Sequence, residues 1–166
     1  MLSGHMAAAV TRGVQSVKGR FVTLKHFACN NQETCRNTTD AVVSKRALRE
    51  IYLRGFQIAM QAKPEAVMTS YNKLNGIYTP NSHDLVTDIL RCEWGFDGLV
   101  MTDWMSTGRG LAEDAACIAA GNDLIMPGGA GNVRAILGAL KAGRITPLQL
   151  QRCAANVLAS LRKTER

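Results

Sequence analysis

The stretch GLVMTDW, Gly98 to Trp104, decides how the rest of the chain is interpreted. Three apolar residues that suit a buried strand lead directly into the carboxylate of Asp103 and the indole of Trp104. An unpaired carboxylate buried at the end of a core strand costs free energy unless another group stabilises it. Asp103 is therefore a turn former, a metal ligand or a nucleophile, and the surrounding sequence has to decide between them.

The same pattern occurs twice upstream. FVTLKHF, residues 21–27, is rich in β-branched and aromatic residues and has Lys25 and His26 near its end, and AVMTSYN, residues 66–72, finishes in polar groups that include Tyr71. A fourth short strand is expected in NDLIMPG, residues 122–128. Helical patterns stand before and between these strands, at residues 3–19, from about Ser44 to Pro64, and at 82–95, 110–121, 131–143 and 146–163.

The alternation of strand and helix, four times over behind an opening helix, predicts a parallel sheet with helical crossovers. A doubly wound sheet would be complete within one chain, whereas a barrel of eight βα units needs roughly 250 residues. Four units would make half a barrel, with two strand edges that must be paired or covered. Polar side chains at three successive strand ends favour the barrel, although a doubly wound sheet also gathers ligands there.

The bulk properties exclude several classes of protein. No run of eighteen apolar residues and no amino-terminal signal pattern occurs, so neither a membrane span nor a secretory signal is expected. The net charge is +7, but the cations are not interleaved with aromatic residues, so nucleic-acid binding is not expected. His5, His26 and His83 lie on different elements, and Cys29 and Cys35 match no common zinc spacing. We expect no metal, no cofactor, and reduced, mostly buried thiols in a cytoplasmic protein.

Placed on one rim, Lys25, His26, Tyr71, Asp103 and Trp104 offer a cation, an imidazole, a phenol, a carboxylate and an aromatic face. This set suits a neutral polyhydroxyl ligand, since sugar hydroxyls bind charged partners and the carbon face of a sugar ring stacks on an indole. Each residue also has a structural interpretation: a core histidine, a core aromatic, a helix cap. The glycine-rich MPGGAGN, residues 126–132, could hold a phosphate at a helix N-terminus, although it lacks the Walker lysine and serine.

Five motifs in order, KHFACNNQET, REIYL, MTSYNKLNG, ILRCEWGFDGLVMTDW and GNDLIMPGG, closely resemble glycoside hydrolase family 3, particularly its bacterial β-glucosidases. The resemblance runs from about Met6 to about Gly129. It implies that residues 1–166 are a single domain, the last four βα units of the family's (β/α)8 barrel. The early barrel strands and a later domain would then lie outside this segment.

The resemblance assigns the aspartate of the family's Ser/Thr-Asp-Trp motif, here Asp103, as the catalytic nucleophile, with Tyr71 beside it. Asp103 would attack the anomeric carbon to give a covalent glycosyl enzyme that water hydrolyses with retention. Lys25, His26 and Arg36 nearby would favour the ionised carboxylate that this attack requires.

The resemblance also implies a sugar-binding set. Lys25 and His26 would hold hydroxyls of the sugar whose bond is cleaved, and Arg36 would be a further sugar contact. Trp104 would stack near the sugar or line the acceptor side, and Met68 would line the pocket wall.

The second carboxyl group that a retaining glycosidase needs as acid and base is expected outside this chain. The loop ACNNQETCR, residues 28–36, contains no histidine, which disfavours the N-acetylglucosaminidase branch of the family. We therefore expect a small β-glucoside or short oligosaccharide as substrate, weak or no turnover by the isolated chain, and self-association through exposed strand edges or pairing with the missing half. A non-catalytic carbohydrate-binding remnant, a β-xylosidase or arabinosidase, and a small phosphate-binding domain remain alternatives.

Overall fold

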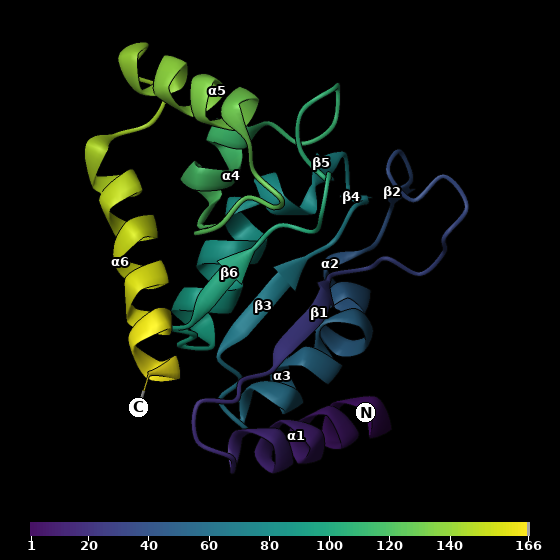
Figure 1. The fold of residues 1–166 in the computed structure, drawn as a ribbon. Coiled ribbons are helices and arrows are strands. Elements are labelled where there is room, and N and C mark those ends of the chain that lie inside the picture. The colour runs from purple at the N-terminus through teal and green to yellow at the C-terminus, as the bar shows by residue number, and fades with distance from the viewer. Residues whose placement is uncertain (166) are drawn as a thin grey trace.

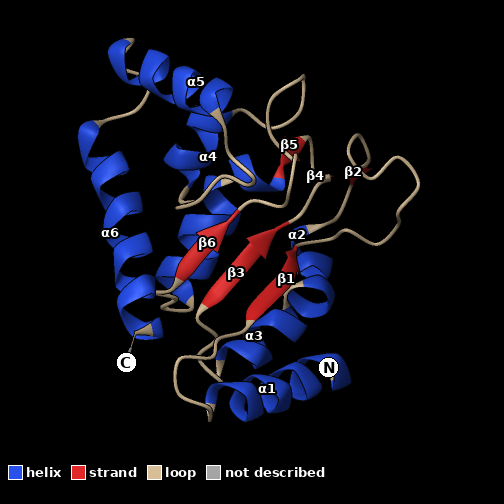
Figure 2. Ribbon diagram, in the orientation of Figure 1, coloured by secondary structure: helices blue, strands red, loops and turns tan. Residues whose placement is uncertain are grey.

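A parallel three-stranded sheet forms the centre of the molecule in the computed structural model, which describes residues 1–165. The strands are β1 (Thr23–Phe27), β3 (Ala66–Thr69) and β6 (Leu99–Met101), in the order β1-β3-β6. All three point the same way, so their carboxyl ends lie along one edge of the sheet (Figures 1 and 2). The predicted α/β class with parallel strands is confirmed.

Helices connect these strands, and short elements fill the loops. The helices are α1 (Leu2–Gln15), α2 (Lys45–Ala47), η1 (Leu48–Tyr52), α3 (Arg54–Met60), η2 (Thr79–Asn81), η3 (Asp84–Glu93), α4 (Asp114–Ala120), α5 (Ala130–Lys141) and α6 (Pro147–Thr164). Of these, η1 and η3 have π-type hydrogen bonding and η2 is a 3-10 turn. None of the described helices is long and apolar enough to span a membrane.

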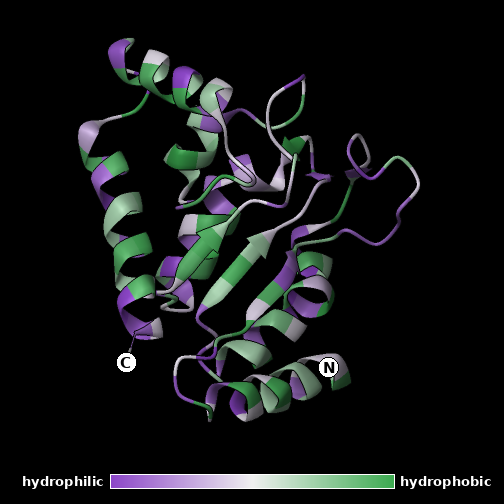
Figure 3. Ribbon diagram, viewed as in Figure 1, coloured by the Kyte–Doolittle hydropathy of each residue, from purple (hydrophilic) through white to green (hydrophobic). Residues whose placement is uncertain are grey.

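The main core lies between the sheet and the helices that follow β1 and β3. Val67 on β3 and Val100 on β6 are fully buried, and the ring of Phe27 meets Phe56 at 5.0 Å and Trp94 at 6.0 Å, both edge to face. Hydrophobic colour accordingly dominates β3 and β6 (Figure 3). A second apolar cluster joins α4, α5 and α6 around Cys117, Ile118 and Ala139.

The predicted fourth strand is reduced to a single bridge between Leu124 and Met101. The segment does run alongside β6, because the N–H groups of Asp123 and Leu124 both donate to Val100 O and the N–H of Thr102 donates to Leu124 O. Regular pairing stops soon afterwards because Pro127 has no N–H to donate. The predicted fourth short strand is therefore wrong as a strand, although its chain segment runs parallel beside β6 in the predicted place.

A second, smaller sheet was missed by the sequence reasoning. Its strands β2 (Asp40–Ala41), β4 (Lys73–Leu74) and β5 (Ile77–Tyr78) each contain two residues, too few to produce a periodic pattern. Asn75 and Gly76 both have positive φ, as a two-residue hairpin turn between β4 and β5 requires. Strand β2 attaches the loop after β1 to this hairpin.

Helix α1 is formed as predicted, but its apolar side chains point outward. Gly4, Ala8 and Thr11 are its buried residues, and Gly4 lies directly against Gly55 of α3. Met6 and Val10 are 60% and 61% exposed, so the apolar spacing that predicts the helix does not mark its packed face. Helix α1 starts at Leu2 with Met1 as its N-cap, one residue before the stretch 3–19 that was predicted to be helical.

The helices expected from about Ser44 and from residue 146 begin where predicted. The Ser44 hydroxyl accepts the N–H of Ala47 at the start of α2, and Thr146 and Gln149 form a capping box at the start of α6. The five cysteines are free, and three of them are buried. Burial raises the pKa of Cys29 to about 11, so this thiol stays protonated and unreactive near neutral pH.

Candidate active site

Three of the predicted site residues meet where the strands end. Asp103 lies two residues beyond β6, Tyr71 two residues beyond β3, and His26 lies within β1. His26 Nε2 is 3.1 Å from Asp103 Oδ2 across the carboxyl edge of the sheet. Asp103 is only 8% exposed, so its carboxylate depends on partners within the protein.

The Asp103 carboxylate and the backbone around it are held by short hydrogen bonds. Its Oδ1 accepts the backbone N–H of Trp104 at 2.7 Å, and its carbonyl oxygen accepts the hydroxyl of Ser106 at 2.9 Å. Tyr71 Oη donates to the carbonyl oxygen of Trp104 at 2.7 Å. Tyr71 therefore holds the backbone that carries the carboxylate, and its ring and Asp103 belong to one cluster.

The pKa values of His26 and Tyr71 are shifted in the directions that keep both groups neutral near pH 7. Burial lowers the pKa of His26 below its ordinary value; Asp103 acts in the opposite direction, and Lys25 and Arg36 add to the lowering. Burial and the neighbouring Asp103 raise the pKa of Tyr71. A neutral imidazole still donates one hydrogen bond to the carboxylate.

Arg36 approaches this cluster from the loop after β1. Its guanidinium carbon lies 4.2 Å from the centre of the Tyr71 ring, a cation–π contact, and its Nη1 pairs with Glu33 Oε2 at 2.8 Å. The Arg36 and Glu33 side chains are 40% and 73% exposed, so this contact lies at the surface. The structure therefore places Arg36 beside Tyr71, as the sugar-binding set requires.

The remaining three predicted residues lie at the margin of the cluster. Lys25 is exposed and lines a hollow between β1, α1 and α3. Met68 is half-buried on β3 and pairs in register with Met101. Trp104 is 56% exposed, which leaves its indole open to a ligand and excludes the core role considered as its alternative.

A buried ion pair behind Asp103 was missed from the sequence. Arg91 Nη2 donates to Asp123 Oδ2 at 2.6 Å, and the same oxygen accepts the backbone N–H of Val100 at 2.9 Å. Asn156 of α6 donates to Asp123 Oδ1 at 2.8 Å, and Arg91 also donates to the carbonyl oxygen of Gly98. These contacts hold the start and the middle of β6, the strand that leads to Asp103. The sequence did contain a signal for this pair. The carboxylate of Asp123 stands directly before an apolar run, just as Asp103 stands at the end of one.

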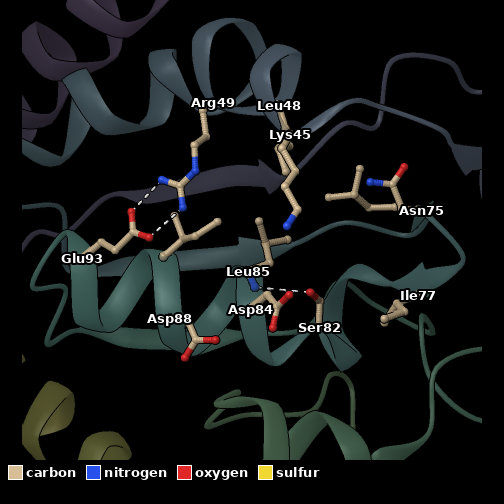
Figure 4. Close-up of a pocket in the computed structure, with 12 residues that line it drawn as sticks. Lys45, Leu48, Arg49, Asn75, Ile77, Ser82, Asp84, Leu85, Asp88 and Glu93 are labelled. Atoms are coloured by element: carbon tan, nitrogen blue, oxygen red, sulfur yellow. Dashed lines mark hydrogen bonds and ion pairs between the residues drawn. The ribbon is translucent and has the colours of Figure 1, made fainter.

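A cavity of about 400 Å³ lies elsewhere, between η1 and η3 (Figure 4). Arg49 and Glu93 close one end of it with two hydrogen bonds of 2.7 Å. At the other end Ser82 Oγ accepts the N–H of Leu85, and Asn75 bonds the backbone of residue 43 through both its side-chain atoms. Lys45 and Asp84 also line this cavity, which shares no residue with the Asp103 cluster.

His83, Asp84 and Asp88 bring one potential ligand atom each to within 4.8 Å of one another at the start of η3. All three are exposed, and His83 Nδ1 lies 3.3 Å from Asp88 Oδ1. An ordinary surface ion pair accounts for this arrangement. None of the three belongs to the Asp103 cluster.

Comparisons with known proteins identify the family of this chain. Residues 1–160 match the family described as Glycosyl hydrolase family 3 N terminal domain. The chain is 48% identical to a β-glucosidase of Ruminococcus albus over 98% of the chain and 18% of that protein. It is 47% identical to an exo-alpha-(1->6)-L-arabinopyranosidase of Bifidobacterium longum, over 98% of the chain and 21% of that protein.

Solved structures give the same result. The chain superposes on β-glucosidase 3B of Thermotoga neapolitana, solved with glycerol, with a TM-score of 0.89 and 45% identity over 96% of this chain and 23% of that one. A structure of that enzyme with glucose gives a TM-score of 0.88. The chain spans about a fifth of the length of the curated relatives it matches. On sequence and on fold, the chain belongs to glycosyl hydrolase family 3, and its residues 1–160 match that family's N-terminal domain.

Proposed function

We propose that this chain is the nucleophile-bearing part of a retaining β-glucosidase, with its strands forming the last four of a (β/α)8 barrel. The observation that carries the proposal is the environment of Asp103, a nearly buried carboxylate fixed at a strand end and bordered by His26, Tyr71 and the exposed Trp104. Oδ1 accepts the backbone N–H of Trp104, whereas Oδ2 lies 3.1 Å from the imidazole of His26, whose pKa is lowered by burial. Within residues 1–165 no lysine or arginine forms an ion pair with this carboxylate.

The proposed mechanism uses the different surroundings of the two carboxylate oxygens of Asp103. The Trp104 N–H orients the carboxylate through Oδ1, and Oδ2 attacks the anomeric carbon as the bond to the leaving oxygen breaks. An acid outside this chain protonates that oxygen, and the same group then activates the water that releases the sugar with net retention. His26, Lys25 and Arg36 bind sugar hydroxyls, the Trp104 indole covers the sugar or the acceptor side, and Met68 forms part of the wall.

Mechanism-based labelling tests the proposal. A 2-deoxy-2-fluoroglucoside with a dinitrophenolate leaving group needs no proton donor, so the first chemical step can be observed in the isolated chain. We expect an intact mass increased by one fluoroglucosyl group, which peptide mapping places on Asp103. Asp103→Asn should abolish the label, and Asp97→Asn, a matched change of an exposed carboxylate, should leave it intact. A label on another carboxylate would overturn the assignment.

The same experiment distinguishes the proposed function from the alternative, a non-catalytic carbohydrate-binding remnant. Such a chain would bind glucose, as an NMR titration would show, but would acquire no label while circular dichroism shows it to be folded. Turnover comparable to that of a complete β-glucosidase would contradict the placement of the acid and base outside the chain.

A second candidate substrate is an L-arabinopyranoside, since the Bifidobacterium longum relative with that printed activity is nearly as similar as the β-glucosidase of Ruminococcus albus. Competition between the corresponding 2-fluoro sugars for labelling of Asp103 would rank them. We place the glucoside first because the solved structures with bound glucose are similar throughout this chain.

Phosphate binding at the glycine-rich turn before α5 is disfavoured. Asn132, in the first turn of α5, donates to both carboxylate oxygens of the buried Asp114 at 3.1 Å. A carboxylate already lies beside this helix start, and a phosphate would bring a second negative charge to the same place. The glycine-rich segment is better explained as the turn between the Leu124 bridge and α5.

A further inference from the structure

The cavity of about 400 Å³ between η1 and η3 has the size of a small-molecule site, and its lining residues take no part in the chemistry proposed at Asp103. Its two helical walls have π-type hydrogen bonding, which is rare in proteins and frequent at functional sites. The β4–β5 hairpin contributes Asn75 and Ile77 to the lining. A ligand bound here would therefore be separate from the sugar.

The inner wall of the cavity is apolar. Leu74, Leu85 and Ile89 are buried along it, and Leu48 is half-buried. Among the described residues that line the cavity, none is aromatic. Since the carbon face of a sugar ring stacks on aromatic side chains, this wall suits an aliphatic group better than a second sugar.

Charged side chains surround the apolar wall and come from facing helices. Lys45 belongs to α2, and Asp84 and Asp88 belong to η3 (Figure 4). Arg49 and Glu93 neutralise one another at one end of the cavity. Within the described chain neither Lys45 nor Asp84 forms an ion pair. One cation and one carboxylate on facing walls are therefore free to meet a ligand.

The two aspartates form an anionic corner together with His83. One potential ligand atom from each of the three residues lies within 4.8 Å of the other two. An ammonium group has three N–H donors and can bond both carboxylates at once. A metal ion could use the same oxygens, but it would leave Lys45 and the apolar wall without a role.

We propose that this cavity binds a small zwitterion in which an ammonium and a carboxylate are joined to an aliphatic side chain, the chemistry of a free apolar amino acid. The ammonium would lie between Asp84 and Asp88, and the carboxylate would pair with Lys45. The aliphatic side chain would pack against Leu85 and Ile89. An anion alone would meet the two carboxylates of η3, and a cation alone would leave Lys45 unpaired, whereas a zwitterion satisfies both walls.

Titration of the isolated chain with leucine, in buffer containing EDTA, tests this site by amide NMR spectra and thermal unfolding. Isocaproate is leucine without its ammonium, and isoamylamine is leucine without its carboxylate, so the two compounds are matched half-ligands. We expect leucine at millimolar concentration to shift the amides of Asn75 and Leu85 and to raise the Tm. Each half-ligand should bind weaker by about tenfold or more, because one charged wall then lacks its partner.

Two variants that each remove one charge locate the binding. Lys45→Gln and Asp84→Asn should each weaken leucine binding by about tenfold or more. Arg46→Gln is the matched control, since Arg46 lies on the same helix as Lys45 but does not line the cavity, and it should leave binding unchanged. All three positions are exposed, so circular dichroism should show the fold retained in each variant.

Three results would overturn the proposal. Absence of leucine binding by the folded chain would show that the cavity is not a site for such a zwitterion. Equal binding of leucine and either half-ligand would show that one charged wall is not used. Leucine binding that survives both Lys45→Gln and Asp84→Asn would place the ligand elsewhere. None of these measurements uses labelling of Asp103, so failure of the proposed function would leave them unaffected.

Discussion

The ends of β6 and β1 both face the candidate active site, but they are held in different ways. Behind Asp103, β6 is held by the Arg91–Asp123 ion pair and by the hydrogen bond from Asn156 to Asp123. The Arg91 and Asp123 side chains are largely and fully buried. The end of β1 continues into a loop whose ion pair, Arg36 with Glu33, is exposed, and the outer edge of β1 is open. The residue proposed to make the covalent bond is therefore fixed by this chain alone, whereas the residues proposed to bind sugar depend on what covers β1.

Removing one arginine from each region should give the largest difference in the free energy of unfolding. Arg91→Ala leaves the carboxylate of Asp123 buried without its cation and should cost about 3–5 kcal/mol of unfolding free energy. Arg36→Ala breaks an exposed pair and should cost about 0–1 kcal/mol. Urea unfolding of the two variants measures both values. Similar losses would show that the two regions are equally well anchored.

A methyl group added at the start of β6 tests how closely that strand is packed. The Cβ of alanine at position 98 would collide with the carbonyl oxygen of Glu65, which is backbone and cannot move freely, so Gly98→Ala should cost about 1–3 kcal/mol. Gly138→Ala in α5 meets nothing within 4 Å and should gain about 0.5–1 kcal/mol through helix propensity. A neutral Gly98→Ala variant, measured by thermal unfolding, would mean that the start of β6 can shift.

The smallest expected effect is a pH dependence at the β1 end. Because burial lowers the pKa of His26, the unfolded chain takes up a proton near the ordinary value of 6.5 while the folded chain does so only at lower pH. More protons are then bound by the unfolded state, so stability falls as the pH drops below about 6.5. His26→Gln should reduce this loss. Urea midpoints of both proteins at about pH 7.5 and about pH 5 measure this loss of stability. An equal fall in the midpoint for the two proteins would contradict the prediction.

Sequence reasoning was accurate where the signal was local and repeated. The strand ends at His26, Tyr71 and Asp103 were located because apolar runs broke into polar groups, and the parallel order brought them to one edge. The helix start at Thr146 was found because a threonine followed by a proline ahead of a helical pattern is a specific start signal.

The missed features depend on distant partners. Periodicity detects α1 but cannot say which face is packed, since that depends on Gly4 meeting Gly55. The Arg91–Asp123 pair joins residues 32 positions apart, and two-residue strands such as β2 are too short to give a pattern. Lys25 was expected beside the sugar, and its position at an open edge follows only from the sheet order.

Helix α6 determines when β6 becomes fully supported during synthesis of the chain. Ser160 and Lys163 of α6 bond to Glu65, whose carbonyl oxygen accepts the N–H of Leu99, while Asn156 of the same helix reaches Asp123. A chain still emerging from the ribosome lacks these partners until residues 156–163 have been synthesised. The strand that leads to Asp103 therefore gains its full support only after α6 has emerged, and nascent chains that stall earlier would present the carboxylate in a loosely held state.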